Sequence, residues 1–207
     1  MGLVMLLTGV PTAHAALIQN SFGLSAPHLT IAFDEHVFPS NSHITTEYMD
    51  MGVVFSPYAH YSPSDGTSPG GSNISNFEPN HQTHPFSMIF STPQTALAFS
   101  LITQYPATTT FYAYLGGIFV ESDTVTTGNS SNDFYGFNGI VFDQISISTT
   151  YAGGGTVNGT GPLLLDSLQF ATTAVPEPET YLLVVVGLAG LLLFGRRGRP
   201  AFLVGDE

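Results

Sequence analysis

The side chains with the clearest chemical potential in this sequence are carboxylates that lack nearby cations. The chain carries 15 acidic side chains against 3 basic ones, and all of the basic ones lie near the C-terminus. Asp34, Glu35 and Asp166 stand out because they lie within apolar runs of strand length. A carboxylate that is buried without Lys or Arg needs hydrogen bonds, a proton, a histidine or a metal ion.

Strand periodicity suggests which of these partners to expect. Alternate residues of an extended strand share a face, so Glu35 shares one with Phe33 and Asp166 shares one with Leu168. Both carboxylates would then point among apolar neighbours. Ca²⁺ accepts carboxylate and carbonyl oxygens in irregular geometry, so we predict a calcium site formed by Glu35 or Asp34 with Asp166. The alternative is that Glu35 and Asp166 lie at strand ends in water.

Histidines and paired carboxylates raise two further possibilities. His81 and His84 have the spacing of zinc ligands, but they lie in a Pro-rich stretch without cysteine, so we expect a solvated loop. A glycan hydrolase would need two carboxylates across a cleft, which nothing in the sequence fixes. No nucleophile elbow or phosphate-cradling glycine loop is present, so we expect no enzymatic activity. The histidines between the predicted signal peptide and the tail are His28, His36, His43, His60, His81 and His84, and the candidate acids are Asp34, Glu35, Asp143 and Asp166.

Aromatic side chains offer a different kind of site. Tyr112 and Tyr114 alternate with Phe111 and Ala113, so the two tyrosines lie on the opposite face of the predicted strand. Exposed tyrosine rings could stack on sugars, and the alternative is ordinary cross-strand packing.

The charge balance excludes other partners. A formal net charge of −12 and the absence of Lys give a surface that repels phosphate, so we expect no nucleic-acid binding. The same surface lacks a basic stripe for anionic lipid. With no Cys, the fold has no disulfides and depends on packing, or on bound ions.

The elements that must position these residues are predicted to be β-strands. Apolar runs of strand length alternate with Gly, Pro, Asn, Ser and Thr, and no 3.6-residue period appears. This pattern predicts an all-β, two-sheet sandwich or jelly roll. Gly116 and Gly117 suit a tight hairpin turn, and residues 57–85 form either a functional loop or a disordered one. The expected strands are 29–35, 52–55, 86–91, 96–103, 108–115, 118–125, 139–148 and 163–170.

Both termini have the character of targeting segments. Residues 1–15 combine a short apolar run with Ala-His-Ala, a small-x-small site typical of signal peptide cleavage. Near the other end, residues 181–194 are uncharged and apolar on every face, so they predict a membrane helix rather than a helix on a globular core. Such a helix rises only ~21 Å against a ~30 Å hydrocarbon core, which local thinning of the bilayer can accommodate. The arginines that follow, and that the positive-inside rule places in the cytoplasm, are Arg196, Arg197 and Arg199.

A proline motif precedes the apolar run. Its residues are Val175, Pro176, Glu177 and Pro178. The order of motif, apolar helix and arginines resembles the PEP-CTERM sorting domain of Gram-negative bacteria. This resemblance implies that an exosortase in the inner membrane cleaves near the motif and releases the ectodomain towards the cell surface or exopolysaccharide.

The preceding domain resembles, more loosely, the jelly-roll passengers found with such tails. The residues that carry this resemblance are 31–35, 44–48, 52–55 and 165–170. Similar passengers look like carbohydrate-binding modules. We therefore expect a signal peptide (1–15), a β-sandwich ectodomain (16–172), a sorting signal (173–199) and a short tail (200–207). The predicted function is that of a non-enzymatic surface or exopolysaccharide-associated protein with carbohydrate as its candidate ligand; the alternative is a secreted glycan-active hydrolase.

Overall fold

The computed structural model describes residues 15–63, 71–77, 83–129, 133–151 and 161–172. The chain divides into two compact units, residues 1–172 and 173–207, and all described residues belong to the first. They form β-strands and one short 3-10 helix, without any α-helix among them, which confirms the predicted all-β class. In this described part, no helix is long and apolar enough to cross a bilayer. Residues 1–14 of the predicted signal peptide and the predicted helix at 181–194 lie outside it.

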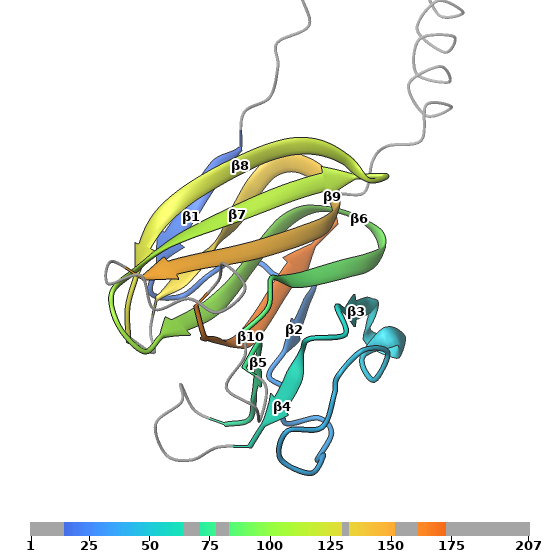
Figure 1. Ribbon diagram of the computed structural model, residues 1–207. Coiled ribbons are helices and arrows are strands. Elements are labelled where there is room, and N and C mark those ends of the chain that lie inside the picture. Colours follow the sequence, from blue (N-terminus) through green and yellow to red (C-terminus); the bar gives the residue numbers. More distant parts are fainter. Residues whose placement is uncertain (1–14, 64–70, 78–82, 130–132, 152–160, 173–207) are drawn as a thin grey trace, which may run out of the picture. The chain divides into compact units, whose positions relative to one another are not determined.

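The strands form one antiparallel sheet that folds over itself (Figure 1). Its order is β4-β5-β10-β6-β9-β7-β8, with β1 added on β9, β2 on β10 and β3 on β6. The elements are β1 (Ala16–Asn20), β2 (Leu29–Ile31), η1 (Met49–Met51), β3 (Val53–Phe55), β4 (His60–Ser62), β5 (Asn73–Ser75), β6 (Phe86–Thr103), β7 (Ala107–Leu115), β8 (Ile118–Thr127), β9 (Phe134–Tyr151) and β10 (Leu163–Ala171).

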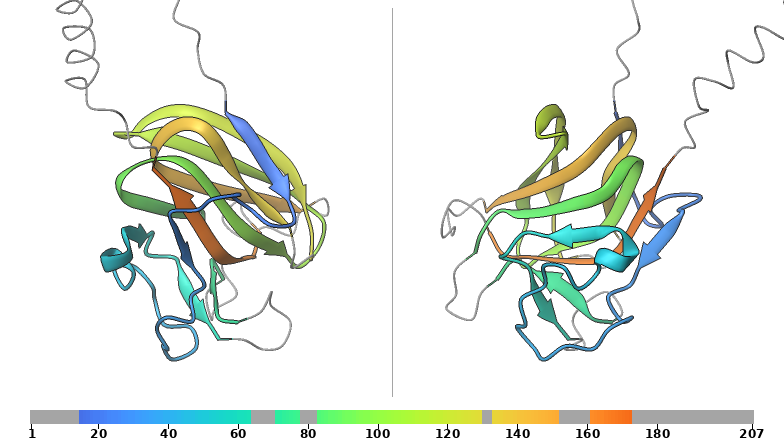
Figure 2. Two further views of the ribbon diagram at one scale, coloured as in Figure 1. Left: turned by 180° about the vertical axis from the view of Figure 1, so that it is seen from behind. Right: turned by 90° about the vertical axis from the view of Figure 1, so that its right-hand side faces the viewer.

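Two long strands join the layers of this sandwich-like fold. The first part of β6 pairs with the last part of β9, as in Phe86 with Ile147, and the last part of β6 pairs with the first part of β9, as in Ser100 with Phe134. The register shifts between Ile89 and Ala96, where β6 curves from one layer into the other (Figure 2). Strands β7 and β8 extend the first layer, and β10, β5 and β4 extend the second.

The core forms where alternate residues of the two layers meet. On β7, Phe111 and Ala113 are fully buried, whereas Tyr112 and Tyr114 between them are half-buried on the outer face. Phe111 meets Phe99 of β6 edge-to-face, with ring centroids 5.5 Å apart. Burial of a ring of this size stabilises the fold by about 1.5–3 kcal/mol, so the period-two pattern of the sequence directly selects this packing.

The hairpin between β7 and β8 turns as predicted. Gly116 and Gly117 have φ values of 57° and 78°, which glycine adopts without strain. Leu115 therefore pairs directly with Ile118 across a two-residue turn.

Three sequence predictions need correction. The strand expected at 29–35 ends at Ile31, because Phe33 adopts a φ of 60° that turns the chain. Glu35 consequently lies in an exposed loop and not on a strand face with Ile31 and Phe33, as the alternation predicted. Segment 57–85 contributes strands β4 and β5, and the runs 86–91 and 96–103 are two parts of the single strand β6.

Candidate functional site

A pocket lies on the outer face of the second layer. Leu165 of β10 pairs with Leu101 of β6, and both side chains are fully buried in the core. The preceding residue, Leu164, therefore faces outward, in one row with Ile102 of β6 and Ser75 of β5. The residues that lie two positions further along each of these strands point the same way, so they extend this outer face towards one end of the sheet.

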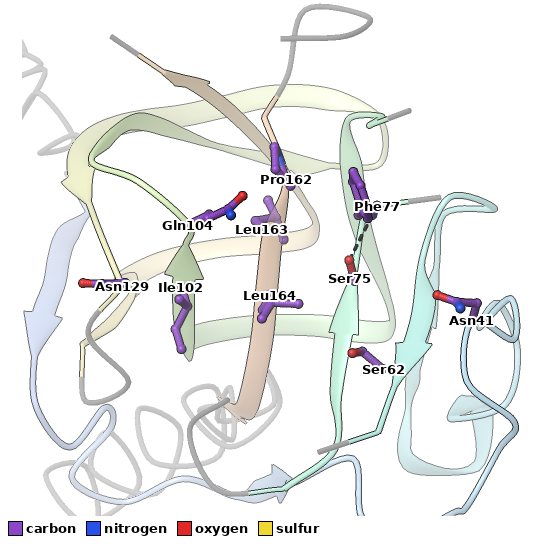
Figure 3. A pocket seen from close by; sticks show the side chains of 10 residues that line it. All are labelled: Asn41, Ser62, Ser75, Phe77, Ile102, Gln104, Asn129, Pro162, Leu163 and Leu164. Atoms are coloured by element: carbon purple, nitrogen blue, oxygen red, sulfur yellow. Dashed lines mark hydrogen bonds between the residues drawn. The ribbon is translucent and has the colours of Figure 1, made fainter. Parts of the chain in front are cut away.

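The pocket has a volume of about 500 Å³ and is built from segments far apart in the sequence (Figure 3). Strands β4, β5, β6 and β10 supply half of the lining residues, and the connecting segments between strands supply the other half. The lining residues are Asn41, Ser62, Ser75, Phe77, Ile102, Gln104, Asn129, Pro162, Leu163 and Leu164.

Among the residues that the structure describes, the lining contains no charged side chain. Asn41, Gln104 and Asn129 are exposed amides, each with donor and acceptor atoms, and they come from three different segments. Phe77 adds a half-buried ring, and the leucines and Ile102 add an apolar floor. Apolar surface combined with a few neutral polar groups suits a small, uncharged, hydroxyl-rich ligand.

Asn76 fixes one wall of the pocket from inside the core. Its side-chain Nδ2 donates to the carbonyl oxygens of His84 at 2.9 Å and Gly161 at 3.1 Å. Its Oδ1 accepts from the backbone N–H of Leu163 at 2.8 Å. One buried amide thus joins β5 to the start of β10, which places Phe77 opposite Leu163 and its neighbours. Sequence reasoning missed Asn76, since no periodic signal marks it.

Buried hydroxyl groups position the other wall. Thr109 Oγ1 lies 2.7 Å from Thr127 Oγ1, which accepts from Thr103 at 3.1 Å. The backbone N–H of Thr103 donates to Gly128 O at 2.8 Å. These bonds hold the ends of β6 and β8 together, so Gln104, one residue beyond β6, and Asn129, two residues beyond β8, both line the pocket. Close by, the Tyr151 hydroxyl donates to Pro162 O at 2.7 Å, and burial raises the pKa of that hydroxyl.

Of the predicted calcium ligands, Asp166 lies elsewhere on β10, whereas Asp34 and Glu35 lie in the loop after β2. Asp166 sits at a β-bulge, where Ser167 has a φ of 49° and the pairing with β6 shifts register. This shift turns Leu168 into the core, so Asp166 does not share a face with it as predicted. The Asp166 side chain is nevertheless only 4% exposed, and its Oδ1 accepts from the N–H of Ser167.

The pKa of Asp166 is raised to about 6, chiefly by burial and also by the carboxylates of Asp34 and Glu35, while hydrogen bonding to Ser167 partly offsets the rise. The exposed Asp34 and Glu35 accept bonds of 2.8 Å from the N–H groups of Ser72 and Ala32. The carboxylates of Asp34 and Glu35 therefore act electrostatically on Asp166. Among the described residues, however, no three acidic or histidine side chains converge closely enough to hold a metal ion.

The remaining predicted residues do not join the pocket. Tyr112 and Tyr114 lie on the outer face of the first layer, where Tyr114 packs on Phe119 with centroids 6.1 Å apart. Asp143 accepts a bond of 2.8 Å from Gly116 N at the hairpin, so it does not face Asp166 across a cleft. His84 stacks on Tyr58 at 3.9 Å, and its predicted partner His81 lies outside the described residues.

The predicted sorting residues 175–178 and 196–199 also lie outside the described part of the chain, but they fall within a segment that matches a known family. Residues 174–199 match the model of the PEP-CTERM protein-sorting motif. The chain carries a PEP-CTERM signal. This signal implies export, sorting at the membrane and processing by an exosortase, as the resemblance predicted.

Other comparisons add little to the PEP-CTERM match. No curated protein matches the sequence. A DUF4465 family protein from Bacteroides caccae is similar in structure, with 10% identity, a TM-score of 0.33 and coverage of 76% of this chain and all of that one. CsCBM6-3 from Clostridium stercorarium, solved with cellobiose, has 16% identity, a TM-score of 0.33 and coverage of 66% of this chain and all of its own. At TM-scores this low, neither the ligand nor the activity of these proteins can be assigned to this chain.

Proposed function

We propose that this protein is a non-enzymatic surface or exopolysaccharide-associated protein whose β-sandwich binds carbohydrate in the pocket around Leu164. The observation that carries the proposal is the neutral lining, in which three exposed amides and a phenyl ring surround an apolar floor. Sugars present hydroxyl groups that amides can bind and apolar C–H faces that a ring or leucine can cover. A phosphate or a carboxylate would find no cation there.

The acidic surface favours the same ligand class. At a net charge of −12, the protein repels polyanions, whereas a neutral glycan approaches without electrostatic cost. The polar side chains of the described lining are amides and hydroxyls. Binding without bond cleavage is therefore the simplest activity that the pocket supports. The ligand would then be a neutral segment of polysaccharide.

The tail supplies the cellular setting of this proposal. We assign residues 1–15 to a signal peptide, 16–172 to the exported domain and 173–199 to the sorting signal, with the arginines in the cytoplasm. Cleavage would fall near Pro176, where the two prolines keep the backbone extended. The mass of the protein recovered from its host tests this point, because an intact segment 181–194 on most molecules would contradict exosortase processing.

A hydrolase remains the second candidate, and one observation favours it. Asp166 has a pKa raised to about 6 beside two further carboxylates, which is the environment of a general acid. Asp166 does not line the pocket, so we rank this function below binding. Release of reducing sugar that Asp166→Asn abolishes would establish the hydrolase instead.

The deciding experiment compares two aromatic sites on a glycan array. Full-length protein in mild detergent should bind neutral glycans without releasing reducing sugar. Phe77→Ala should weaken binding by roughly fivefold, because an aromatic contact contributes about 1 kcal/mol. Tyr112→Ala, on the other layer, is the matched control and should bind as the wild type does. Loss of binding in Tyr112→Ala alone would place the site on the predicted tyrosines instead of the pocket.

A further inference from the structure

Two histidines that are 17 residues apart in the sequence face each other beside the pocket. His43 and His60 form an isolated antiparallel bridge. The flanking backbone bonds run from Ile44 N to Ala59 O and from Tyr61 N to Ser42 O, each 2.8 Å long. The histidines themselves therefore occupy a non-hydrogen-bonded pair, the register in which opposite side chains approach most closely. Their ring centroids are 4.3 Å apart.

Backbone carbonyl groups fix the protonation of both rings. His43 Nδ1 lies 3.0 Å from Pro57 O, and His60 Nδ1 lies 3.3 Å from Asn41 O. A carbonyl oxygen only accepts, so each Nδ1 carries a proton and each Nε2 of the neutral ring carries a lone pair. Metal-binding histidines are oriented in this way, with the distal ring nitrogen bonded to a carbonyl and the other nitrogen directed at the ion.

One of these lone pairs has no partner within the protein. His60 is 1% exposed, and its Nε2 is buried without a hydrogen bond. Leaving such an atom unsatisfied costs about 1–3 kcal/mol, which calls for an explanation. His43 is exposed, so an incoming ion can reach the pair from solvent on its side.

We propose that His43 and His60 form a bidentate site for a divalent transition-metal ion, such as Zn²⁺ or Cu²⁺. Two neutral imidazole nitrogens suit these ions, whereas Ca²⁺ and Mg²⁺ prefer oxygen ligands. Water completes the coordination shell, as it does in open metal sites. The site uses His43 and His60 in place of the pair that spacing suggested, His81 and His84.

One residue, Asn41, belongs both to the surroundings of the histidine pair and to the lining of the pocket. Asn41 holds His60 with its backbone oxygen and lines the pocket as well. A bound ion would fix the loop that carries Asn41 and His43 against β4. Metal binding is argued independently of the proposed function, so its test requires no glycan.

The test uses the full-length protein in mild detergent, purified without a histidine tag and stripped of metal. Zn²⁺ titrated in a calorimeter should bind with a stoichiometry of one, and Cu²⁺ should give an electron paramagnetic resonance spectrum with two nitrogen ligands. His43→Gln should weaken Zn²⁺ binding at least about tenfold and remove one nitrogen from the spectrum. Because His43 is exposed, this variant should keep the melting temperature of the metal-free wild type.

Matched variants make the result decisive. His60→Gln should match His43→Gln if it folds, while His28→Gln and the double change at His81 and His84 should bind Zn²⁺ as the wild type does. Millimolar Ca²⁺ should not displace the Zn²⁺. Unchanged affinity in His43→Gln, loss that follows His81 and His84, or displacement by Ca²⁺ would each overturn the proposal.

Discussion

Strand β10 carries two sites of opposite character, two residues apart. Leu164 opens into a neutral pocket whose polar groups are mostly exposed, whereas Asp166 is buried beside other carboxylates. The pocket is held by fully satisfied buried groups such as Asn76. The carboxylate of Asp166 is hydrogen-bonded to Ser167, which offsets only part of the effect of its burial. The contrast teaches that this fold places neutral polar groups around its pocket and a buried acidic group next to them, on the same strand.

The largest effect should come from removing the support of the pocket. Asn76→Ala leaves the Leu163 N–H and the carbonyl groups of His84 and Gly161 without their buried partner. Each unsatisfied group costs about 1–3 kcal/mol, so we expect a loss near 3 kcal/mol in the free energy of unfolding. Urea denaturation measures it, with Asn129→Ala, an exposed amide of the same pocket, as the control. Equal stabilities of the two variants would show that Asn76 does not position the wall.

The second largest effect should be a stabilisation by Ca²⁺ that depends on Asp166 and not on the pocket. If Asp166 with Asp34 or Glu35 binds Ca²⁺, a hundredfold excess over Kd stabilises the fold by about 2.7 kcal/mol. Melting curves with Ca²⁺, with chelator and with NaCl of equal ionic strength distinguish binding from screening. Asp166→Asn should abolish the excess, and Asp65→Asn, outside the described residues, should not. A shift no larger than that in NaCl would exclude the calcium site.

The pH dependence of stability should reveal Asp166 in the absence of Ca²⁺. Its folded pKa of about 6 lies above the ordinary value of 3.8, so the folded state holds a proton more tightly than the unfolded state. Its contribution is therefore complete below pH 3.8 and is lost as the pH rises through 6. At pH 8 the free energy of unfolding of Asp166→Asn should exceed that of the wild type by about 1–3 kcal/mol, and near pH 3 the two should be equal. A difference that is independent of pH would contradict a buried, neutral Asp166.

The smallest effect should be confined to ligand binding. Gln104→Ala removes one exposed amide, so glycan affinity should fall by about 1 kcal/mol, or roughly fivefold, with an unchanged melting temperature. Titration calorimetry with the best glycan from the array measures this. Gln144→Ala, on the other layer, serves as the control for a lost amide. A fall in stability together with affinity would make Gln104 a structural residue.

Much of the fold could be predicted because alternation is a local signal. The Phe111 and Ala113 pattern predicted β7, and the two glycines predicted its turn into β8. The same rule failed at Phe33, whose positive φ ends β2, and at Ser167, whose bulge reverses the facing of the residues after Asp166. Neither residue type announces such a conformation.

The pocket could not be predicted for a different reason. Asn41, Ser75 and Asn129 come from short or irregular segments. The strand order β4-β5-β10-β6 brings the first two towards β6, and the bond from Thr103 N to Gly128 O brings the segment of Asn129 there. Strands β4 and β5 have three residues each, too few for a period to appear in a Ser-rich and Pro-rich stretch. The tail, in contrast, is a linear motif, which is why its residues sufficed to predict the match at 174–199.

The position of β10 has a mechanical consequence. Pro162, Leu163 and Leu164 line the pocket at the start of this strand, and the chain leaves its other end at Ala171 towards the tail. If the C-terminus is tethered and the ligand is pulled, the tension runs along β10, which is clamped by β6 on one side and by β5 and β2 on the other. Its ladder bonds lie across the strand and would be sheared together instead of being unzipped one by one. Resistance to rupture in this direction is set by the rate of unfolding and not by the equilibrium stability of the domain, because forced unfolding follows the unfolding rate.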